Sequence, residues 1–328
     1  MADRLRVAVV GCGRMGRAHV EALLSLTDGA SCRGATAPGG ATGGSPIEVV
    51  VCDPVRDARA WAVSQGVRAY EDLEKADADG GLDALVVAAP TPAHVELVGA
   101  ALELGCAVLC EKPGGESPTA LRDLGARAGA RGLPLRLGYW HRFVPALRQA
   151  RDAVRDGSLG EVLALTSAQW DGAPPSPAFL ARSGGELVDM GVHEIDFARW
   201  SLGCRLEPRG AAWRRDSDGH NAAVGVLQGE RGTVVTVSAG RVLQGGYDGC
   251  WVELLGSRSS IFDRWLWGPE GQVVNRQAVV DQDREMLRLV AGSDAPHLAT
   301  AAEGAEVLAL ANALTAAATV AHEVAVER

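Results

Sequence analysis

The chain has 328 residues, of which 47% are hydrophobic and 22% are charged, with a formal net charge of −9. This length suits two domains, and the composition is ordinary for a globular protein. The acidic balance argues against nucleic acid or an anionic membrane as the main partner, and no apolar run approaches the about 20 residues of a membrane span. The seven cysteines form no C-x-x-C pair. We therefore expect no structural metal, no disulfide and a cytoplasmic location.

The first motif is a glycine-rich turn between a strand and a helix. The apolar run Leu5–Val10 predicts a buried parallel strand, and residues 11–16, G-C-G-R-M-G, follow it directly before a helical stretch at 17–26. In a G-x-G-x-x-G turn, the glycines permit close approach of the backbone to a pyrophosphate, and the helix N-terminus faces the anion. In this setting the motif predicts dinucleotide binding, whereas a glycine turn without a ligand is the alternative.

An acidic residue follows the next predicted strand, at 47–52. A carboxylate at Asp53 would hydrogen-bond the adenosine ribose and repel a 2′-phosphate, which favours NAD over NADP. Asp53 lies farther from Gly16 than the usual distance of about 20 residues. The glycine-rich stretch 28–46 accounts for the excess, and we interpret it as a surface insertion. Arg56 leaves some tolerance for NADP open.

Strands and helices alternate through the first part of the chain. We expect helices near 54–64, 93–104 and 118–130, and strands at 84–89, 107–110 and 133–137. This alternation predicts a doubly wound parallel sheet, with ligands at the carboxyl ends of its strands. Two of these ends carry the unusual sequences T-P-A-H at Thr91 and E-K-P at Glu111. Lys112 could polarise a substrate oxygen there, although a surface charge at a turn is the plain alternative.

The rhythm changes after residue 138. A helix at 144–156 leads to a strand at 161–170, and more strands are expected near 209–214, 222–227, 233–239, 251–255 and 260–262. Helices at 283–291 and 301–323 close the chain. The run of strands predicts an α+β domain with a large, open, mostly antiparallel sheet. A flat face of such a sheet could serve as an oligomer interface.

One stretch of this second part carries a proton-handling pair. In the stretch Ser183–Trp200 we expect residues 183–185 to form a loop that leads into a helix, which would place Asp189 and His193 on the same face. Histidine titrates near neutral pH, and a carboxylate can fix its tautomer. Taken alone, such a pair is more often a helix face with a polar cap than a catalytic site.

Together these motifs resemble the Gfo/Idh/MocA family, the group of glucose–fructose oxidoreductase and inositol dehydrogenase. The resemblance spans nearly the whole chain. It rests on the glycine turn, on the T-P-A-H and E-K-P sequences, on H-R-F-V-P at His141, and on G-G-E-L-V-D-M-G-V-H-E-I-D at Gly184. It implies a Rossmann domain over residues 1–138 and an α+β domain over 139–328 for substrate binding and oligomerisation. Homodimers or homotetramers are expected through the open sheet.

The resemblance also implies roles for individual residues. The catalytic set is Lys112, Asp189 and His193, and the bond to the proline after Lys112 is often cis. Substrate contacts are expected from His141, Arg142, Trp170, Asp171, Asp189, His193 and Tyr247. Cofactor contacts are expected from Gly11, Gly13, Arg14, Met15, Gly16, Asp53, Pro54, Ala89, Pro90, Thr91, Pro92, His94, Glu111 and Lys112.

The implied reaction is NAD-dependent oxidation of a secondary hydroxyl on a cyclic polyol or sugar. His193 takes the hydroxyl proton, Lys112 polarises the substrate oxygen, and Asp189 orients the histidine. Inositol is the expected substrate, with a deoxy- or amino-sugar as the alternative. Two other functions stay open: a glycoside hydrolase that retains NAD, and a non-catalytic regulator that binds the dinucleotide. The presence of both Lys112 and His193 disfavours the regulator.

Overall fold

The computed structural model describes residues 4–27, 47–172, 176–180, 182–214, 221–241 and 248–326. Tyr247 and the glycine-rich stretch 28–46 lie outside these ranges. The chain divides into two compact units, the first formed by Met1–Gly138 with Val279–Ala302 and the second by Tyr139–Ala278 with Glu303–Arg328. The sequence pattern places Val279–Ala302 in the C-terminal domain, whereas the structure adds this segment to the first unit.

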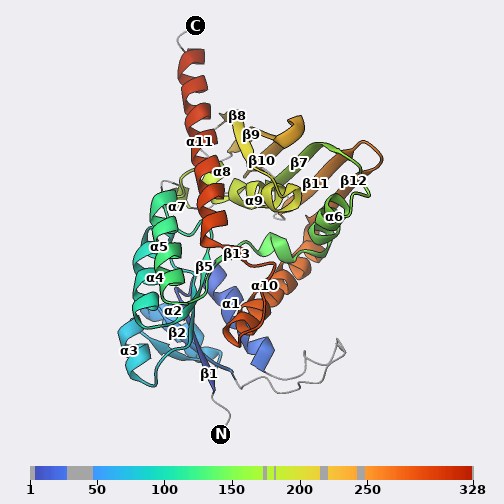
Figure 1. The fold of residues 1–328 in the computed structure, drawn as a ribbon. Coiled ribbons are helices and arrows are strands. Elements are labelled where there is room, and N and C mark those ends of the chain that lie inside the picture. The colour runs from blue at the N-terminus through green and yellow to red at the C-terminus, as the bar shows by residue number, and fades with distance from the viewer. Residues whose placement is uncertain are drawn as a thin grey trace. The chain divides into compact units, whose positions relative to one another are not determined.

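A seven-stranded sheet forms the centre of the first unit (Figure 1). Its strands lie in the order β13-β6-β5-β4-β1-β2-β3, and all pairs are parallel except β13 with β6 at one edge. Their bounds are Leu5–Val10 (β1), Ile47–Cys52 (β2), Arg68–Tyr70 (β3), Ala84–Val87 (β4), Ala107–Glu111 (β5), Leu135–Gly138 (β6) and Ala299–Thr300 (β13). The order in which successive strands are added reverses between β1 and β4, and open α/β sheets bind ligands at such a point. The predicted doubly wound sheet is confirmed.

Helices cover both faces of this sheet, with α4 and α5 on one side and α1 on the other (Figure 1). Their bounds are Arg14–Thr27 (α1), Arg56–Ser64 (α2), Leu73–Ala78 (α3), His94–Glu103 (α4) and Pro118–Ala130 (α5), with a 3₁₀ turn η2 at Thr91–Ala93. The sequence pattern does not predict β3 and α3, because elements of three and six residues are too short to show a period. A local signal for α3 does exist: the Asp72 side chain caps it by accepting the N–H of Lys75 at 2.8 Å.

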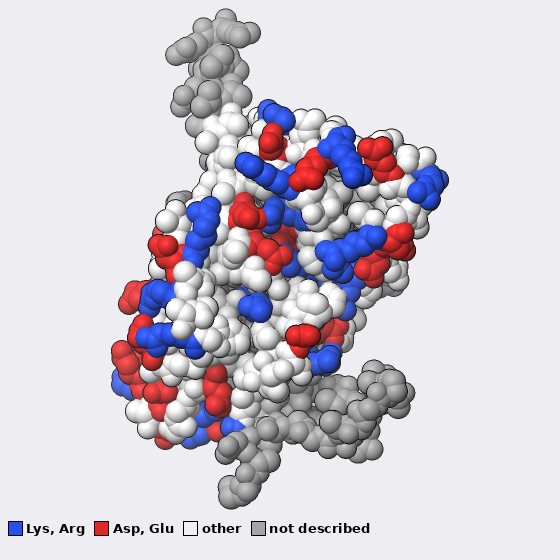
Figure 2. All heavy atoms as spheres, in the orientation of Figure 1, with Lys and Arg blue, Asp and Glu red and all other residues white. Residues whose placement is uncertain are grey.

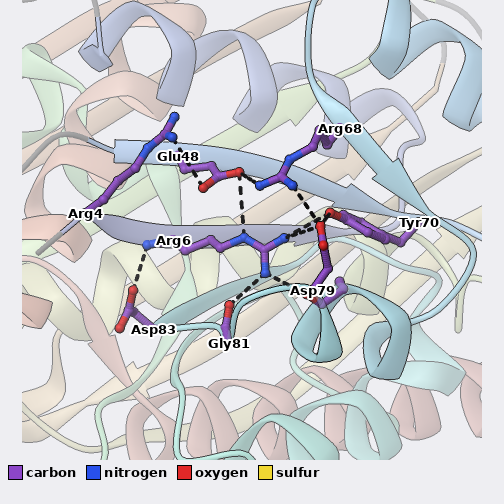
Figure 3. A network of polar contacts seen from close by, with 9 residues as sticks. Arg4, Arg6, Glu48, Arg68, Tyr70, Asp79, Gly81 and Asp83 are labelled. Carbon is purple, nitrogen blue, oxygen red and sulfur yellow. Dashed lines mark hydrogen bonds and ion pairs between the residues drawn. The ribbon is translucent and has the colours of Figure 1, made fainter.

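A network of ion pairs and hydrogen bonds around the buried Arg6 connects β1, β2 and β3 (Figure 3). Arg6 is 5% exposed, and its guanidinium donates to the carbonyl oxygens of Ala76 at 2.6 Å and Gly81 at 2.8 Å. It also donates to the Tyr70 hydroxyl at 3.0 Å and lies 3.7 Å from the Glu48 carboxylate. Arg6 thus ties three strands to α3 and to the loop after it, away from the strand ends where ligands are expected.

We expect Arg6→Met to lower the free energy of unfolding by about 3 kcal/mol, because the buried carbonyl oxygens of Ala76 and Gly81 lose their charged donor and Glu48 loses one of its cationic partners. Urea unfolding followed by circular dichroism measures this change. Arg68→Met is the matched control, since Arg68 also pairs with Glu48 but its side chain is 54% exposed. Its loss should change stability little. Equal losses in the two variants would contradict the role given to burial.

The second unit is built on a six-stranded sheet with the order β12-β11-β7-β10-β9-β8. The bounds are Val162–Trp170 (β7), Leu206–Arg214 (β8), Ala222–Gly229 (β9), Val234–Gly240 (β10), Gly249–Gly256 (β11) and Ser260–Trp267 (β12). Strands β7 and β10 pair in parallel, and the other described pairs are antiparallel. The sheet is therefore the predicted open, mostly antiparallel one.

The two faces of this sheet differ, because side chains alternate along each strand. On the inner face Leu165, Val235 and Val237 are completely buried. Helices α8 (Glu186–Asp189) and α9 (Gly191–Leu202) pack against this face. The outer face carries exposed apolar side chains from four strands, namely Val224, Val226, Val234, Leu255 and Phe262. One face is thus a core, and the other is an apolar surface.

Further helices and two 3₁₀ turns complete the described chain. Their bounds are Trp140–Phe143 (η3), Pro145–Arg155 (α6), Pro177–Leu180 (α7), Glu230–Gly232 (η4), Gly268–Val290 (α10) and Ala301–Val326 (α11). Across the described ranges, no helix has the length and apolar character needed to cross a membrane.

The prediction of one continuous helix after the loop at 183–185 is wrong. Met190 separates α8 from α9, and α9 begins anew at Gly191. The N–H of His193 donates to the carbonyl oxygen of Met190, three residues back, at 3.0 Å. The four-residue spacing of Asp189 and His193 therefore crosses a junction between two helices, so it does not imply a shared helix face.

Candidate functional site

The three motif glycines lack a side chain for different physical reasons. Gly11 has a φ of +90°, and a Cβ atom there would lie 2.6 Å from the backbone nitrogen of Ala89. A Cβ atom at Gly16 would lie 1.8 Å from the carbonyl oxygen of Gly11, so α1 packs directly on the turn. At Gly13, by contrast, no atom lies within 4 Å of the Cβ position. Gly11 and Gly16 thus shape the turn, and Gly13 leaves its backbone open to a ligand.

Asp53 is fixed beside this turn. The N–H of Gly11 donates to the carbonyl oxygen of Cys52 at 2.9 Å, which joins the ends of β1 and β2. The Asp53 side chain is buried, and its carboxylate accepts the backbone N–H groups of Cys12 at 2.7 Å and Val55 at 2.8 Å. The carboxylate therefore lies at the carboxyl end of β2, where the sequence predicts a contact with the ribose.

The loop after β4 is closed by its own histidine. His94 is buried, and its Nε2 atom lies 2.8 Å from the carbonyl oxygen of Ala89. Since a carbonyl only accepts, Nε2 carries the proton. Burial lowers the pKa of His94, which favours the neutral ring. His94 thus shapes the loop from within. Three of the loop's predicted cofactor contacts remain at least partly exposed, namely Pro90, Thr91 and Pro92.

Lys112 follows β5, at the carboxyl ends of the strands of the same sheet. It is partly exposed, and the Lys112–Pro113 bond is cis, as the resemblance implies. Glu111, predicted as a cofactor contact, is instead buried, with its Oε1 atom 3.0 Å from Nε2 of His19. The other predicted contacts Arg14, Met15 and Pro54 are exposed or partly exposed.

In the second unit, His193 lies within a cage of aromatic rings. Its side chain is buried, and it stacks on His141 with ring centroids 4.2 Å apart and an interplanar angle of 18°. The rings of Tyr139 and Trp140 meet it edge-on at centroid distances of 5.9 Å and 5.7 Å. Rings packed in this way hold the imidazole in one orientation. The structure thus brings together two of the predicted substrate contacts, His141 and His193.

A buried carboxyl group lies beside this pair. Oε1 of Glu194 lies 3.5 Å from Nδ1 of His141, and the Ser167 hydroxyl donates to its other oxygen. Burial raises the pKa of Glu194 to about 8, although the Ser167 hydrogen bond opposes the shift. The carboxyl group is therefore mostly protonated at neutral pH, and its contact with His141 is not an ion pair.

Arg142 anchors η3, which carries His141. It is buried, and its guanidinium donates to both oxygens of Asp196, at 2.8 Å and 2.6 Å, and to Glu303 at 3.1 Å. Burial lowers the pKa of Arg142, but the charges of these two carboxylates outweigh it and raise the pKa. The structure gives Arg142 an anchoring role where the resemblance implies a substrate contact.

An arginine outside the predicted set holds the predicted catalytic carboxylate. Arg241 follows β10 and is 1% exposed. Its Nη2 atom donates to Oδ2 of Asp189, and its Nη1 atom donates to Oε1 of Glu186 at 3.1 Å. One guanidinium therefore fixes two carboxylates of α8. Asp189 is held in this ion pair at the end of α8, just before the helix that carries His193.

Trp170 lies on the outer face of the second sheet, opposite to α9. Its Nε1 atom donates to the Ser238 hydroxyl at 3.3 Å, and its ring meets Trp251 edge-on at 5.1 Å. Ser167 of the same strand faces α9, and residues three apart on a strand point to opposite faces. The structure therefore does not bring Trp170 together with His193.

The remaining predicted substrate contacts lie at strand ends. Asp171 follows β7, and its Oδ1 atom accepts Nε2 of Gln169 at 3.4 Å. Gln169 pairs with the buried Cys250 and so belongs to the inner side of the sheet. Tyr247 is not among the described residues. Within the described part of the chain, no group of three or more His, Cys, Asp or Glu residues could hold a metal ion.

The residues of the first unit fit a dinucleotide. The space above Gly13, the fixed carboxylate of Asp53 and the start of α1 at Arg14 lie at adjoining strand ends. Two family profiles match the chain: an oxidoreductase family with an NAD-binding Rossmann fold over residues 5–139, and the GFO/IDH/MocA C-terminal domain over residues 147–262. The chain belongs to the Gfo/Idh/MocA family of oxidoreductases. Its first unit contains the NAD-binding Rossmann domain of this family.

Individual members of the Gfo/Idh/MocA family align with most of the chain. The rhizopine catabolism protein MocA of Rhizobium meliloti is 33% identical over 95% of this chain and 94% of its own length. The myo-inositol dehydrogenase Hyg17 of Streptomyces leeuwenhoekii is 30% identical over 81% of this chain and 78% of its own length. A probable dehydrogenase from Thermotoga maritima has the same fold, with a TM-score of 0.82, 23% identity and coverage of 97% of both chains.

Proposed function

We propose that the protein is an NAD-dependent dehydrogenase that oxidises a secondary hydroxyl of an inositol or a related cyclic polyol. The proposal is carried by one observation in the second unit, the fixed orientation of His193 among the rings of Tyr139, Trp140 and His141. A buried imidazole in a single orientation can accept a proton in a defined direction. The myo-inositol dehydrogenase among the relatives supports the substrate class.

Each residue of the predicted set has a role in this proposal. His193 takes the proton of the substrate hydroxyl, and Lys112 stabilises the negative charge that develops on the oxygen. Asp189, held by Arg241, orients the hydrogen bonds of His193 and the substrate. NAD supplies the hydride acceptor when it is bound. The contacts with NAD are assigned to the glycine turn, to Asp53 and to the loop at Thr91.

The proposal is tested by the absorbance of reduced cofactor when the purified protein meets NAD, and then NADP, with a panel of polyols and aldoses. We expect reduction of NAD with at least one inositol isomer and slower reduction of NADP, because the Asp53 carboxylate repels a 2′-phosphate. A preference for aldoses would change the substrate class. No reduction of either cofactor with any compound would contradict the proposal.

We also propose that the protein forms homodimers or homotetramers through the outer face of the second sheet. The exposed side chains of Val226, Val234 and Phe262 lie on this one face, and a second copy that covers them would remove apolar surface from water. Light scattering tests this assembly, and a monomer at micromolar concentration would contradict it.

On the face of the molecule drawn in Figure 2, acidic and basic side chains are interspersed, and nothing there favours nucleic acid as a partner.

We also propose that the protein is located in the cytoplasm. The six described cysteines are free, and five of them, including Cys12 and Cys52, are buried. Free, buried thiols are compatible with a reducing compartment. Fractionation of cells that produce the protein tests this location, and recovery outside the cytoplasm would contradict it.

A further inference from the structure

A cluster of three buried ionisable side chains in the first unit includes Glu111, the residue before Lys112. His19 of α1 is completely buried, and its Nδ1 atom lies 2.8 Å and 3.0 Å from the two carboxylate oxygens of Asp283 in α10. Its Nε2 atom lies 3.0 Å from Oε1 of Glu111, the last residue of β5. Residues from three distant parts of the sequence thus meet at one imidazole.

The contacts of His19 favour its charged form. Both ring nitrogens face carboxylate oxygens, and both donate to them when the carboxylates are ionised. Burial raises the pKa of Asp283, and the charge of His19 opposes that shift. Burial alone lowers the pKa of His19, but Asp283 and Glu111 outweigh this effect and raise the pKa to about 10. His19 is therefore a buried cation held between two carboxylates.

Glu111 is confined from its other side as well. A Cβ atom at Gly138, the last residue of β6, would lie 2.6 Å from Oε1 of Glu111, so the carboxylate occupies the space that this glycine leaves. The main chain continues from Glu111 into Lys112, and the carbonyl oxygen of Glu111 accepts the N–H of Gly114 at 3.1 Å. The carboxylate that His19 holds therefore belongs to the first residue of the turn that carries Lys112.

The same histidine belongs to the helix that follows the glycine turn. Helix α1 begins at Arg14, and His19 lies in its second turn. A rigid hydrogen bond from His19 to Glu111 thus fixes the end of β5 relative to the start of α1. Asp283 adds the segment Val279–Ala302 to this connection within the same unit.

We propose that His19 is a positioning residue: its cation clamps Glu111 and so holds the turn of Lys112 in register with the glycine turn that binds the dinucleotide. This inference rests on the proposed function through the role of Lys112. Displacing a catalytic group by about 1 Å can cost about 100-fold in rate. The clamp therefore acts on turnover through the geometry of Lys112 and without contact to the substrate.

The test compares His19→Gln with wild type in two measurements. Steady-state kinetics should show a kcat lowered about 10- to 100-fold, with the KM for NAD changed far less, because Lys112 moves while the glycine turn keeps its shape. Hydrogen exchange by mass spectrometry should show faster exchange in the peptide over residues 107–117. Asp283→Asn, which keeps the shape but removes one charge, should give a smaller change of the same kind and serves if His19→Gln does not fold.

Arg6→Met is the matched control for lost stability, because Arg6 is a buried cation of the same sheet but lies at the amino end of β1, whereas Glu111 lies at the carboxyl end of β5. It should leave kcat and the exchange of residues 107–117 as in wild type. The proposal is overturned if His19→Gln leaves that exchange unchanged, or if Arg6→Met raises it equally. It is also overturned if kcat per folded molecule stays at the wild-type value in a polyol-oxidising enzyme. If the wild type oxidises no polyol, the proposed function fails, and the exchange data alone decide whether the clamp exists.

Discussion

Replacing His193 by alanine should lower kcat by about 100- to 10,000-fold, because the hydroxyl proton then has no positioned acceptor. The affinity for NADH, measured by fluorescence, should stay close to that of wild type, since the glycine turn and Asp53 belong to the other unit. The variant lacks a ring packed against Tyr139, Trp140 and His141, so its kinetics should be compared well below its melting temperature. Added imidazole should restore part of the lost turnover.

His297→Ala is the control for His193→Ala. His297 is held by a carboxylate, with Nδ1 2.9 Å from Oε2 of Glu285, but it lies in the first unit and has no role in the proposed reaction. Its loss should leave kcat unchanged. Wild-type turnover in His193→Ala would show that His193 has no role in the reaction. Lys112 would then have to act without His193 as the base.

Replacing Arg241 by methionine should lower the free energy of unfolding by about 3–5 kcal/mol, because the carboxylates of Glu186 and Asp189 lose the cation that compensates them. Turnover should also fall, because Asp189 is released from the orientation in which we propose that it acts on His193. Arg241→Lys keeps the charge but cannot reproduce both contacts of the planar guanidinium, so it should recover part of the stability and less of the turnover. Urea unfolding and kcat of each variant measure the two effects separately.

Arg209→Met is the control for the arginine substitutions. Arg209 pairs with Glu207 at 2.9 Å, but its side chain is 53% exposed, and its loss should change stability little. If Arg241→Met were as stable as Arg209→Met, the buried ion pair would not hold α8. Full stability loss with unchanged kcat would leave Arg241 a structural role alone.

Local signals allowed the strand ends that carry the proposed cofactor contacts to be predicted from sequence. The glycine turn, Asp53 and Lys112 each follow a strand that its own residues define, and the order of strands and helices then brings the strand ends together. The space above Gly13 and the fixed Asp53 carboxylate agree with this prediction. The short elements β3 and α3 lacked the length to show a period.

The parts that could not be predicted depend on contacts between distant residues. Arg241 lies 52 residues from Asp189, and His19 lies 264 residues from Asp283, so no local pattern connects them. The position of Trp170 follows from which residues of β7 face α9, and this depends on how the helices pack on the sheet. The junction at Met190 depends on where the main chain forms its hydrogen bonds.

The central claim is direct transfer of hydrogen from a carbinol carbon of the substrate to the nicotinamide. The most direct measurement uses an inositol isomer that carries deuterium on the carbon to be oxidised, with mass spectrometry of the reduced cofactor. We predict one deuterium per reduced nicotinamide and slower turnover than with the unlabelled compound. Reduced cofactor without deuterium would contradict the claim. Turnover of a glycoside without net reduction of free NAD would instead identify the NAD-retaining hydrolase.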